Sequence, residues 1–279
     1  MSESSSSPEP RIPACAYPAG HVTLVAAISL ALLPAFRFQI NPDGMCYIDV
    51  ARELLAGDVG HAINAYWGPL LSWLMVPLLA LGVEPLLAGK LASVGIGAVT
   101  CLAVYRYSGL FGLAPGLRAA VLLGVLPMTV VGSLKLLGPD QLLLCVLLAY
   151  FSIVFRDDYP SRPVFGVLCG LLGGLAYLSK AYGVYFFGAH LLLMTALHVV
   201  RTEDAPTPRQ ALPTLGLALA AFAVTPRSWL RVITAKCARL PLGPSGHDQP
   251  ATYSLASRHP PLHAPHARRD RANRGTEGD

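Results

Sequence analysis

The chain has few charged residues for its length. Asp, Glu, Lys and Arg make up 13% of its 279 residues, whereas an average globular chain carries about 25%. Hydrophobic residues make up 53%, and the mean hydropathy is +0.51. So few charges cannot cover a surface that faces water, so most of the surface must face lipid. The composition excludes an ordinary water-soluble domain and predicts an integral membrane protein.

Several motifs of soluble enzymes and metal sites are also missing from the sequence. It contains no P-loop, GxSxG or HExxH motif, so ATP hydrolysis and the common hydrolase mechanisms have no support. The six cysteines form no CxxC pair and have no histidine at metal-ligand spacing. We therefore expect small buried thiols rather than a metal site, and no nucleotide cofactor.

The positive net charge is confined to the C-terminal region. Residues 226–279 carry nine Lys or Arg and four acids, whereas residues 1–225 carry twelve of each. A folded basic patch therefore has no support in the rest of the chain, and we expect no nucleic-acid partner. Residues 226–279 are predicted to be a polar basic tail that is disordered or frame-shifted. A natural polar tail is the alternative.

The apolar runs predict an all-α polytopic membrane protein. Residues 1–19 are rich in Ser and Pro and are predicted to be a disordered cytoplasmic leader, and the first run after them is an uncleaved signal anchor. We expect about seven transmembrane helices, with interfacial helices in the first outer loop. The runs occupy residues 21–36, 88–105, 119–134, 141–155, 164–179, 182–200 and 210–225.

The shorter apolar stretch at residues 67–82 contains two prolines, and whether it crosses the bilayer decides the topology. If it lies at the interface or re-enters, the arginine-bearing loops share one side, which the positive-inside rule assigns to the cytoplasm. Asp43, Asp140 and Lys180 then all lie on the opposite face. If it crosses, Asp43 is separated from the other two. We prefer the first arrangement because a single assumption groups both the arginines and these three residues.

The segment at 41–57, NPDGMCYIDVARELLAG, is typical of a short interfacial helix. Asn41 is its expected N-cap, Pro42 its first residue, and Gly57 lies past its end. Asp43 would occupy the first turn, where exposed amide groups and the helix dipole favour a carboxylate that can accept a proton or hold a cation. The simpler interpretation is that Asp43 only helps to cap the helix.

Two further ionisable residues stand beside apolar runs. Asp140, in GPDQ, precedes LLLCVLLAY, and a role in starting that helix is enough to explain it. Lys180 lies between two apolar runs in GGLAYLSKAYGVYFF, where a lysine usually extends toward the lipid headgroups. The functional alternative is an ammonium group that holds a phosphate.

Taken together, these segments resemble the GT-C superfamily of polytopic membrane glycosyltransferases. The resemblance is closest to members described as family 39 or RgtA/B/C/D-like, related to protein O-mannosyltransferases and aminoarabinose transferases. It rests on DGMCY, WGPLLSWL, PDQLLL and GLAYLSK in this order. It implies a GT-C-like transmembrane domain at 20–225 with interfacial helices at 42–82. It also implies a multi-pass protein of the plasma (inner) membrane with its active site on the outer face.

The resemblance further implies a hexosyl- or pentosyltransferase that is surrounded by membrane lipids. Such an enzyme moves a sugar from a polyprenyl-phosphate donor to a hydroxyl of a lipid, glycan or protein acceptor. Asp43 would be the general base. Asp140 would orient a substrate or a divalent metal, and Lys180 would offset the charge of the departing polyprenyl phosphate. Tyr47 and Trp67 would be further substrate-binding residues.

Two departures from the family pattern leave metal use and the acceptor open. Gly44 stands where many relatives have a second acid, and Trp67-Gly68-Pro69 replaces a frequent His-Pro-Pro. Family members are also longer, so we expect a truncated product, and an inactive fragment is one alternative. Another is a transporter or flippase of a lipid-linked or small polar substrate, although the ionisable residues lie at predicted span ends and no internal repeat is visible.

Overall fold

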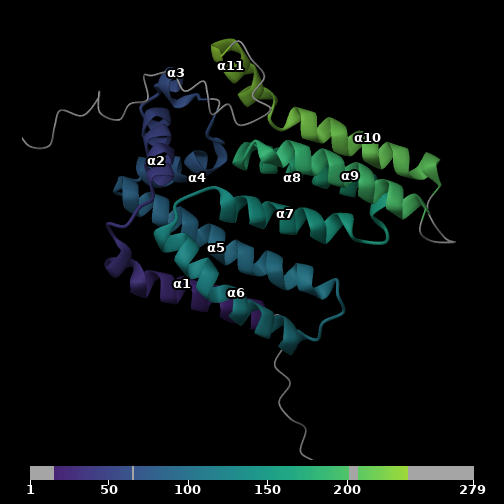
Figure 1. Cartoon of the computed structure of the whole chain (residues 1–279), viewed down its shortest axis with the longest axis horizontal. Coiled ribbons are helices and arrows are strands. Elements are labelled where there is room, and N and C mark those ends of the chain that lie inside the picture. The colour runs from purple at the N-terminus through teal and green to yellow at the C-terminus, as the bar shows by residue number, and fades with distance from the viewer. Residues whose placement is uncertain (1–15, 65, 201–206, 238–279) are drawn as a thin grey trace, which may run out of the picture. The chain divides into compact units, whose positions relative to one another are not determined.

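A computed structural model describes residues 16–64, 66–200 and 207–237, all within one compact unit that spans 1–244. The described residues form eleven α-helices and one 3-10 helix and contain no strand, which confirms the all-α class (Figure 1). The helices are α1 (Ala16–Phe36), α2 (Pro42–Leu55), α3 (Val59–Ala62), α4 (Leu70–Ala80), α5 (Pro85–Gly109), α6 (Pro115–Lys135), α7 (Asp140–Val154), η1 (Tyr159–Ser161), α8 (Pro163–Ser179), α9 (Tyr182–Val200), α10 (Pro208–Val224) and α11 (Arg227–Cys237).

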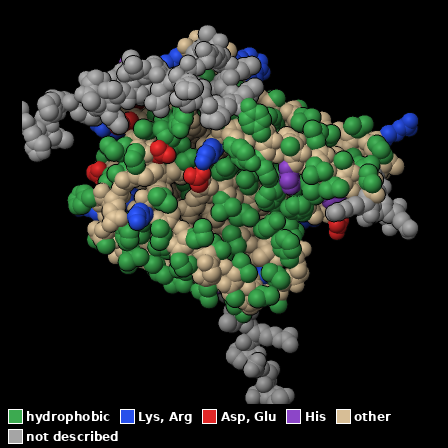
Figure 2. Space-filling model, in the orientation of Figure 1, with side chains coloured by type: hydrophobic (Ala, Val, Ile, Leu, Met, Phe, Trp, Pro, Cys, Tyr) green, Lys and Arg blue, Asp and Glu red, His purple; other side chains and the backbone are tan. Residues whose placement is uncertain are grey.

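Four of the described helices are long and apolar enough to cross a membrane, namely α1, α5, α6 and α9. The other predicted spans form the shorter helices α7, α8 and α10, of 15, 17 and 17 residues. A 17-residue helix is about 25 Å long, less than the roughly 30 Å of a hydrocarbon core. Hydrophobic side chains cover most of the face in Figure 2. The structure is therefore a polytopic helical membrane protein with four helices of full spanning length.

Small residues allow the helices of the bundle to pack closely. At Gly166 and Gly170 of α8, an added Cβ would overlap the carbonyl oxygens of Thr214 and Ala218 in α10. Only glycine permits such a close approach of two helix backbones, as is common between helices in membranes. α8 also packs against α7, and α7 against α5. This stacking places the start of α7 and the end of α8 side by side.

Three short helices, α2, α3 and α4, lie at one end of the bundle (Figure 1). The apolar side of α2 packs on α4, and Ser72 Oγ of α4 donates a hydrogen bond to the Tyr47 carbonyl at 2.9 Å. With 11 residues, α4 is about 16 Å long and cannot cross the bilayer alone. This length supports the arrangement in which residues 67–82 do not cross.

The start of α2 follows the expected pattern with one difference. The helix begins at Pro42 after Asn41, and Gly57 beyond its end has a φ of +75°. The Asn41 side chain makes no capping hydrogen bond, and its Oδ1 is buried without a partner in the described structure. The helix start is therefore fixed by Pro42 and by packing rather than by a side-chain cap.

The region after residue 226 begins differently from the expected polar tail, because residues 227–237 form α11. Trp229 and Ile233, one turn apart, are buried on one side of this helix, as in an amphipathic helix. On the same side, Lys236 Nζ donates a hydrogen bond to the Ile63 carbonyl at 2.6 Å. α11 thus covers the loop between α3 and α4. The remainder of the predicted tail and most of the predicted leader lie outside the described residues.

Candidate active site

The five residues proposed from the sequence come from four separate segments at the same end of the bundle. Asp43 and Tyr47 lie on α2, Trp67 lies in the loop before α4, Asp140 begins α7, and Lys180 joins α8 to α9. In the face shown in Figure 2, most of the visible Asp and Glu side chains gather at this end.

An ion pair connects Asp140 to Lys180. Lys180 Nζ donates to Asp140 Oδ1 at 2.6 Å across 40 residues of sequence. The Lys180 backbone is extended, because α8 ends at Ser179, and this directs the chain out of the helix beside the first turn of α7. The two side chains are 49% and 77% exposed. An exposed pair contributes little to stability. Because both groups are exposed, they remain accessible to a ligand.

Tyr47 connects this pair to Asp43. Its side chain is buried, and burial is the largest cause that raises the pKa of its phenol well above the usual range, followed by the negative charges of Asp43 and Asp140. Both carboxylates therefore lie within electrostatic range of one hydroxyl group, which stays protonated and can donate a hydrogen bond. Asp43 itself is exposed in the first turn of α2.

Trp67 lies against Tyr47, with ring centroids 5.2 Å apart in an edge-to-face arrangement. The Asn64 side chain holds this loop, because its Oδ1 accepts hydrogen bonds from the backbone N–H groups of Trp67 at 2.6 Å and Tyr66 at 3.1 Å. Asn64 was not among the residues predicted from the sequence. The available signal was an asparagine shortly before a glycine and a proline, which is typical of a side-chain-stabilised turn.

Two glycines bring the segments of the site into contact. At Gly68, an added Cβ would overlap the carbonyl oxygens of Leu178 and Ser179, directly before Lys180. At Gly44, an added Cβ would lie 2.8 Å from Cβ of Leu137, in the loop that leads to Asp140. A second acid at position 44 would not fit this contact. The two departures from the family pattern thus coincide with close backbone packing around the site.

The charged groups at the site do not form a recognisable metal centre. No group of three or more His, Cys, Asp or Glu side chains that could hold a metal occurs among the described residues. The site itself offers the carboxylates of Asp43 and Asp140, and the second is paired with Lys180. These residues do not fit a resident metal.

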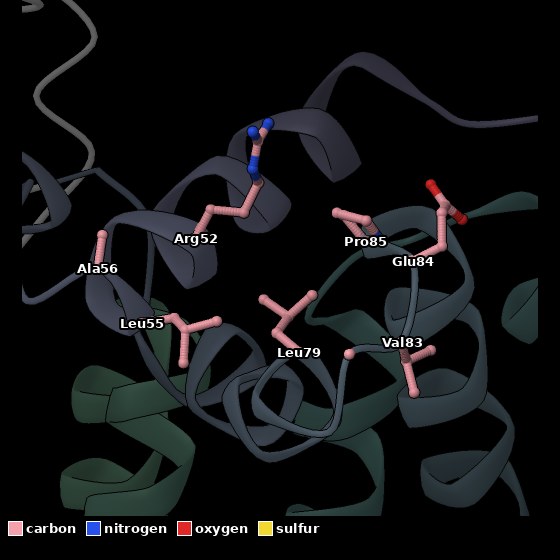
Figure 3. Close-up of a pocket in the computed structure, with 8 residues that line it drawn as sticks. Arg52, Leu55, Ala56, Leu79, Val83, Glu84 and Pro85 are labelled. Atoms are coloured by element: carbon pink, nitrogen blue, oxygen red, sulfur yellow. The ribbon is translucent and has the colours of Figure 1, made fainter.

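A pocket of about 370 Å³ lies at the opposite end of α2, away from these residues (Figure 3). Leu55 and Leu79 form part of its wall, while Arg52 and Glu84 lie at its edge. Both charged groups have structural partners: Arg52 lies 3.9 Å from a neighbouring carboxylate on α2, and Glu84 caps α5. None of the five proposed residues lines this pocket, so the candidate site is the one around Tyr47.

The fold and the site define a helical membrane protein with two carboxylates and an ammonium group gathered at one end of the bundle. Residues 66–229, more than half of the chain, match the family described as dolichyl-phosphate-mannose-protein mannosyltransferase. The chain belongs to this family, which is of the GT-C type, and it is therefore a membrane glycosyltransferase. Searches of curated proteins and of solved structures found no match.

The matched residues include part of the site. Trp67, Asp140 and Lys180 lie within the match, whereas Asp43 and Tyr47 precede it. The family confirms the resemblance seen in the sequence and favours a transferase over a transporter. The individual roles rest on the geometry described above.

Proposed function

We propose that this chain transfers a sugar from a polyprenyl-phosphate donor to a hydroxyl group of a lipid, glycan or protein on the outer face of the membrane. The family supports the reaction class. The observation that carries the proposal is the exposed ion pair of Lys180 and Asp140, which is built from separate segments at the end of the bundle that also carries Asp43.

Lys180 is suited to the departing phosphate. Its ammonium group, 49% exposed, can exchange the Asp140 oxygen for a phosphate oxygen without leaving its position. Negative charge grows on the phosphate as its bond to the sugar breaks, and a fixed cation stabilises that transition state more than the ground state. Asp140 orients the ammonium group for this role.

Asp43 is suited to the acceptor. As the acceptor oxygen bonds to the anomeric carbon, its proton moves to the Asp43 carboxylate. The bond between that carbon and the phosphate oxygen breaks, and its electron pair leaves with the polyprenyl phosphate toward Lys180. The protonated phenol of Tyr47 lies within electrostatic range of both carboxylates. The indole of Trp67, whose backbone N–H donates to Asn64 Oδ1, offers an aromatic surface to the sugar.

Helix length and charge support the outer-face assignment. Because α4 is too short to cross the bilayer, the ends of the helices that carry the site lie opposite the arginine-bearing loops. The short interfacial helix α2 then lies beside the headgroups, where a polyprenyl phosphate presents its phosphate.

A matched pair of aspartates on α2 tests the proposal. Membranes that contain the parent chain, Asp43→Asn or Asp49→Asn are supplied with a panel of labelled polyprenyl-phosphate sugars. We expect Asp43→Asn to lower transfer by about 10²- to 10⁴-fold, the usual contribution of a general base. Asp49→Asn, which removes the same charge two turns further on, should keep the parent rate.

Equal amounts of inserted protein are required in every sample. Undiminished transfer by Asp43→Asn would remove Asp43 from the mechanism. Transfer by none of the chains with any donor of the panel would contradict the proposed donor class.

A further inference from the structure

Lys90 on α5 is a buried lysine outside the described site. It is only 3% exposed, within one of the four helices of full spanning length. Lysine is rarely buried without partners, because removing an ammonium group from water is costly. An ionisable residue in such a helix is therefore expected to have a specific role.

The partners of Lys90 are two backbone carbonyl groups from other parts of the chain. Lys90 Nζ donates to the Gln39 carbonyl at 2.7 Å and to the Leu134 carbonyl at 2.5 Å. Gln39 follows the end of α1, and Leu134 lies in the last turn of α6. The Leu134 carbonyl belongs to the C-terminus of a helix, where partial negative charge favours a cation.

Each of these carbonyl groups belongs to the chain segment that precedes one of the two carboxylates of the site. Gln39 precedes Pro42, the first residue of α2, and so fixes the approach to Asp43. Leu134 ends the helix before the loop to Asp140. One ammonium group thus joins the two segments that carry the acids.

The same two segments also pack on each other close to Lys90. Leu137 is 4% exposed and lies between two glycines. A Cβ added at Gly44 would lie 2.8 Å from Cβ of Leu137. A Cβ added at Gly89, the neighbour of Lys90, would lie 2.8 Å from Cδ2 of Leu137. The contacts of Leu137 and the hydrogen bonds of Lys90 therefore constrain the same pair of segments.

We infer that Lys90 is a positioning residue that fixes the placement of Asp43 relative to Asp140 and Lys180. This inference rests on the proposed function, in which one carboxylate serves the acceptor and the ion pair serves the donor. Lys90 touches neither substrate. Its contribution is geometric, and an error of about 1 Å in the placement of reacting groups can cost about 100-fold in rate.

Three variants test the inference in the full-length chain. Lys90→Met removes both hydrogen bonds at nearly constant length, while Lys90→Arg keeps the cation and its donors. Lys135→Met is the matched control, because Lys135 is exposed and directly follows Leu134. We expect Lys90→Met to lower kcat by about 10- to 100-fold with little change in the donor KM. Lys90→Arg should recover most of the rate, and Lys135→Met should match the parent.

A second measurement does not depend on turnover. Spin labels are attached to cysteines at the exposed positions 45 and 136, after the native cysteines are replaced, and the distribution of distances between the labels is recorded in lipid nanodiscs. We expect a narrow distribution in the parent and in Lys135→Met, and a broad or shifted one in Lys90→Met. If Lys90→Met does not accumulate, Lys90→Gln, which is neutral and shorter, takes its place.

The two measurements separate the two proposals. An unchanged distance distribution in the neutral Lys90 variant would overturn the positioning role. Unchanged kcat together with parent-like distances in all variants would overturn it as well. If no chain transfers sugar and the distances still broaden, Lys90 positions the segments and the proposed function fails.

Discussion

Both ends of the helix bundle carry ion pairs between near neighbours in the sequence, such as Arg52 and Asp49 on α2, but among the described residues only the end with α2 also pairs charges from distant segments. Between α7 and α8, Asp158 binds Arg156 at 2.8 Å and Arg162 at 2.9 Å within one short loop. At the other end, Lys180 binds Asp140 across 40 residues. The first cluster forms wherever that loop forms, whereas the second requires α7 and α8 to pack.

The difference shows how the two ends use charge. Arg156 and Arg162 also lie over the ring of Phe165, 5.0 and 5.6 Å from its centroid, so their charges serve their own end of the bundle. The ion pair of Lys180 joins separate helices and remains exposed. A charged pair that contributes little to stability and yet is built from distant segments is better explained by a ligand.

In the comparison of the two ends, the largest expected effect comes from neutralising the ion pair. We expect Lys180→Met or Asp140→Asn to lower transfer by about 10²- to 10³-fold, as when one stabilising group of a transition state is removed. The double variant should be no worse than the more damaging single one, because the residues act as a unit. Rates in membranes with equal protein give the measurement.

Arg156→Met provides the control at the other end of the bundle. It removes one positive charge from a loop and should keep the parent rate. If it costs as much as Lys180→Met, the contrast between the two ends would not hold.

An intermediate effect is expected for Gly68→Ala. The added methyl group would overlap the carbonyl oxygens before Lys180, so the loop must move away from α8. We expect a loss of about 1–3 kcal/mol in the free energy of unfolding, the usual cost of overpacking, together with slower transfer. Gly95→Ala, with open space around it, is the matched control. Thermal unfolding in detergent compares the two, and equal stability would argue against the close contact.

The smallest effect is expected for Asp158→Asn. The hydrogen bond from Arg156 lowers the pKa of Asp158 below its ordinary value of 3.8. Its contribution to stability is therefore present above that value and is lost as the pH falls through the lower folded pKa. The variant should keep the parent transfer rate and show a flatter loss of thermal stability in acid. A large loss of transfer would mean that this end also serves the reaction.

Local sequence signals predicted the helix that carries Asp43 and Tyr47. The helix beginning at Pro42 and ending before Gly57 follows from backbone preferences of two residues, which act wherever they occur. Asp140 and Lys180 stood out because each interrupts an apolar run. Their alternative explanations, a helix start and a lysine at the headgroups, are also compatible with the structure. The sequence could not reveal that the two form one pair.

Other features depend on contacts that no local pattern shows. Lys90 lay within a predicted span, yet its carbonyl partners come from positions 39 and 134. α11 was expected to be part of a tail because its residues are polar on average, but two of them complete a buried cluster over the loop after α3. An amphipathic helix buries its apolar side only where another surface is present to pack against. For α11, that surface is formed by distant segments of the chain.

The sequence by itself determined that the protein faces lipid, that it is helical and which family it belongs to. A shortage of charge, long apolar runs and short motifs in a fixed order carry this information, and all three are properties of the chain alone. It also singled out the three ionisable residues of the site. Only the tertiary structure decided which of them meet, why positions 44 and 68 are glycines, and how a buried ammonium group joins the two acid-bearing segments. These depend on distances between residues far apart in the chain, which packing of the helices sets.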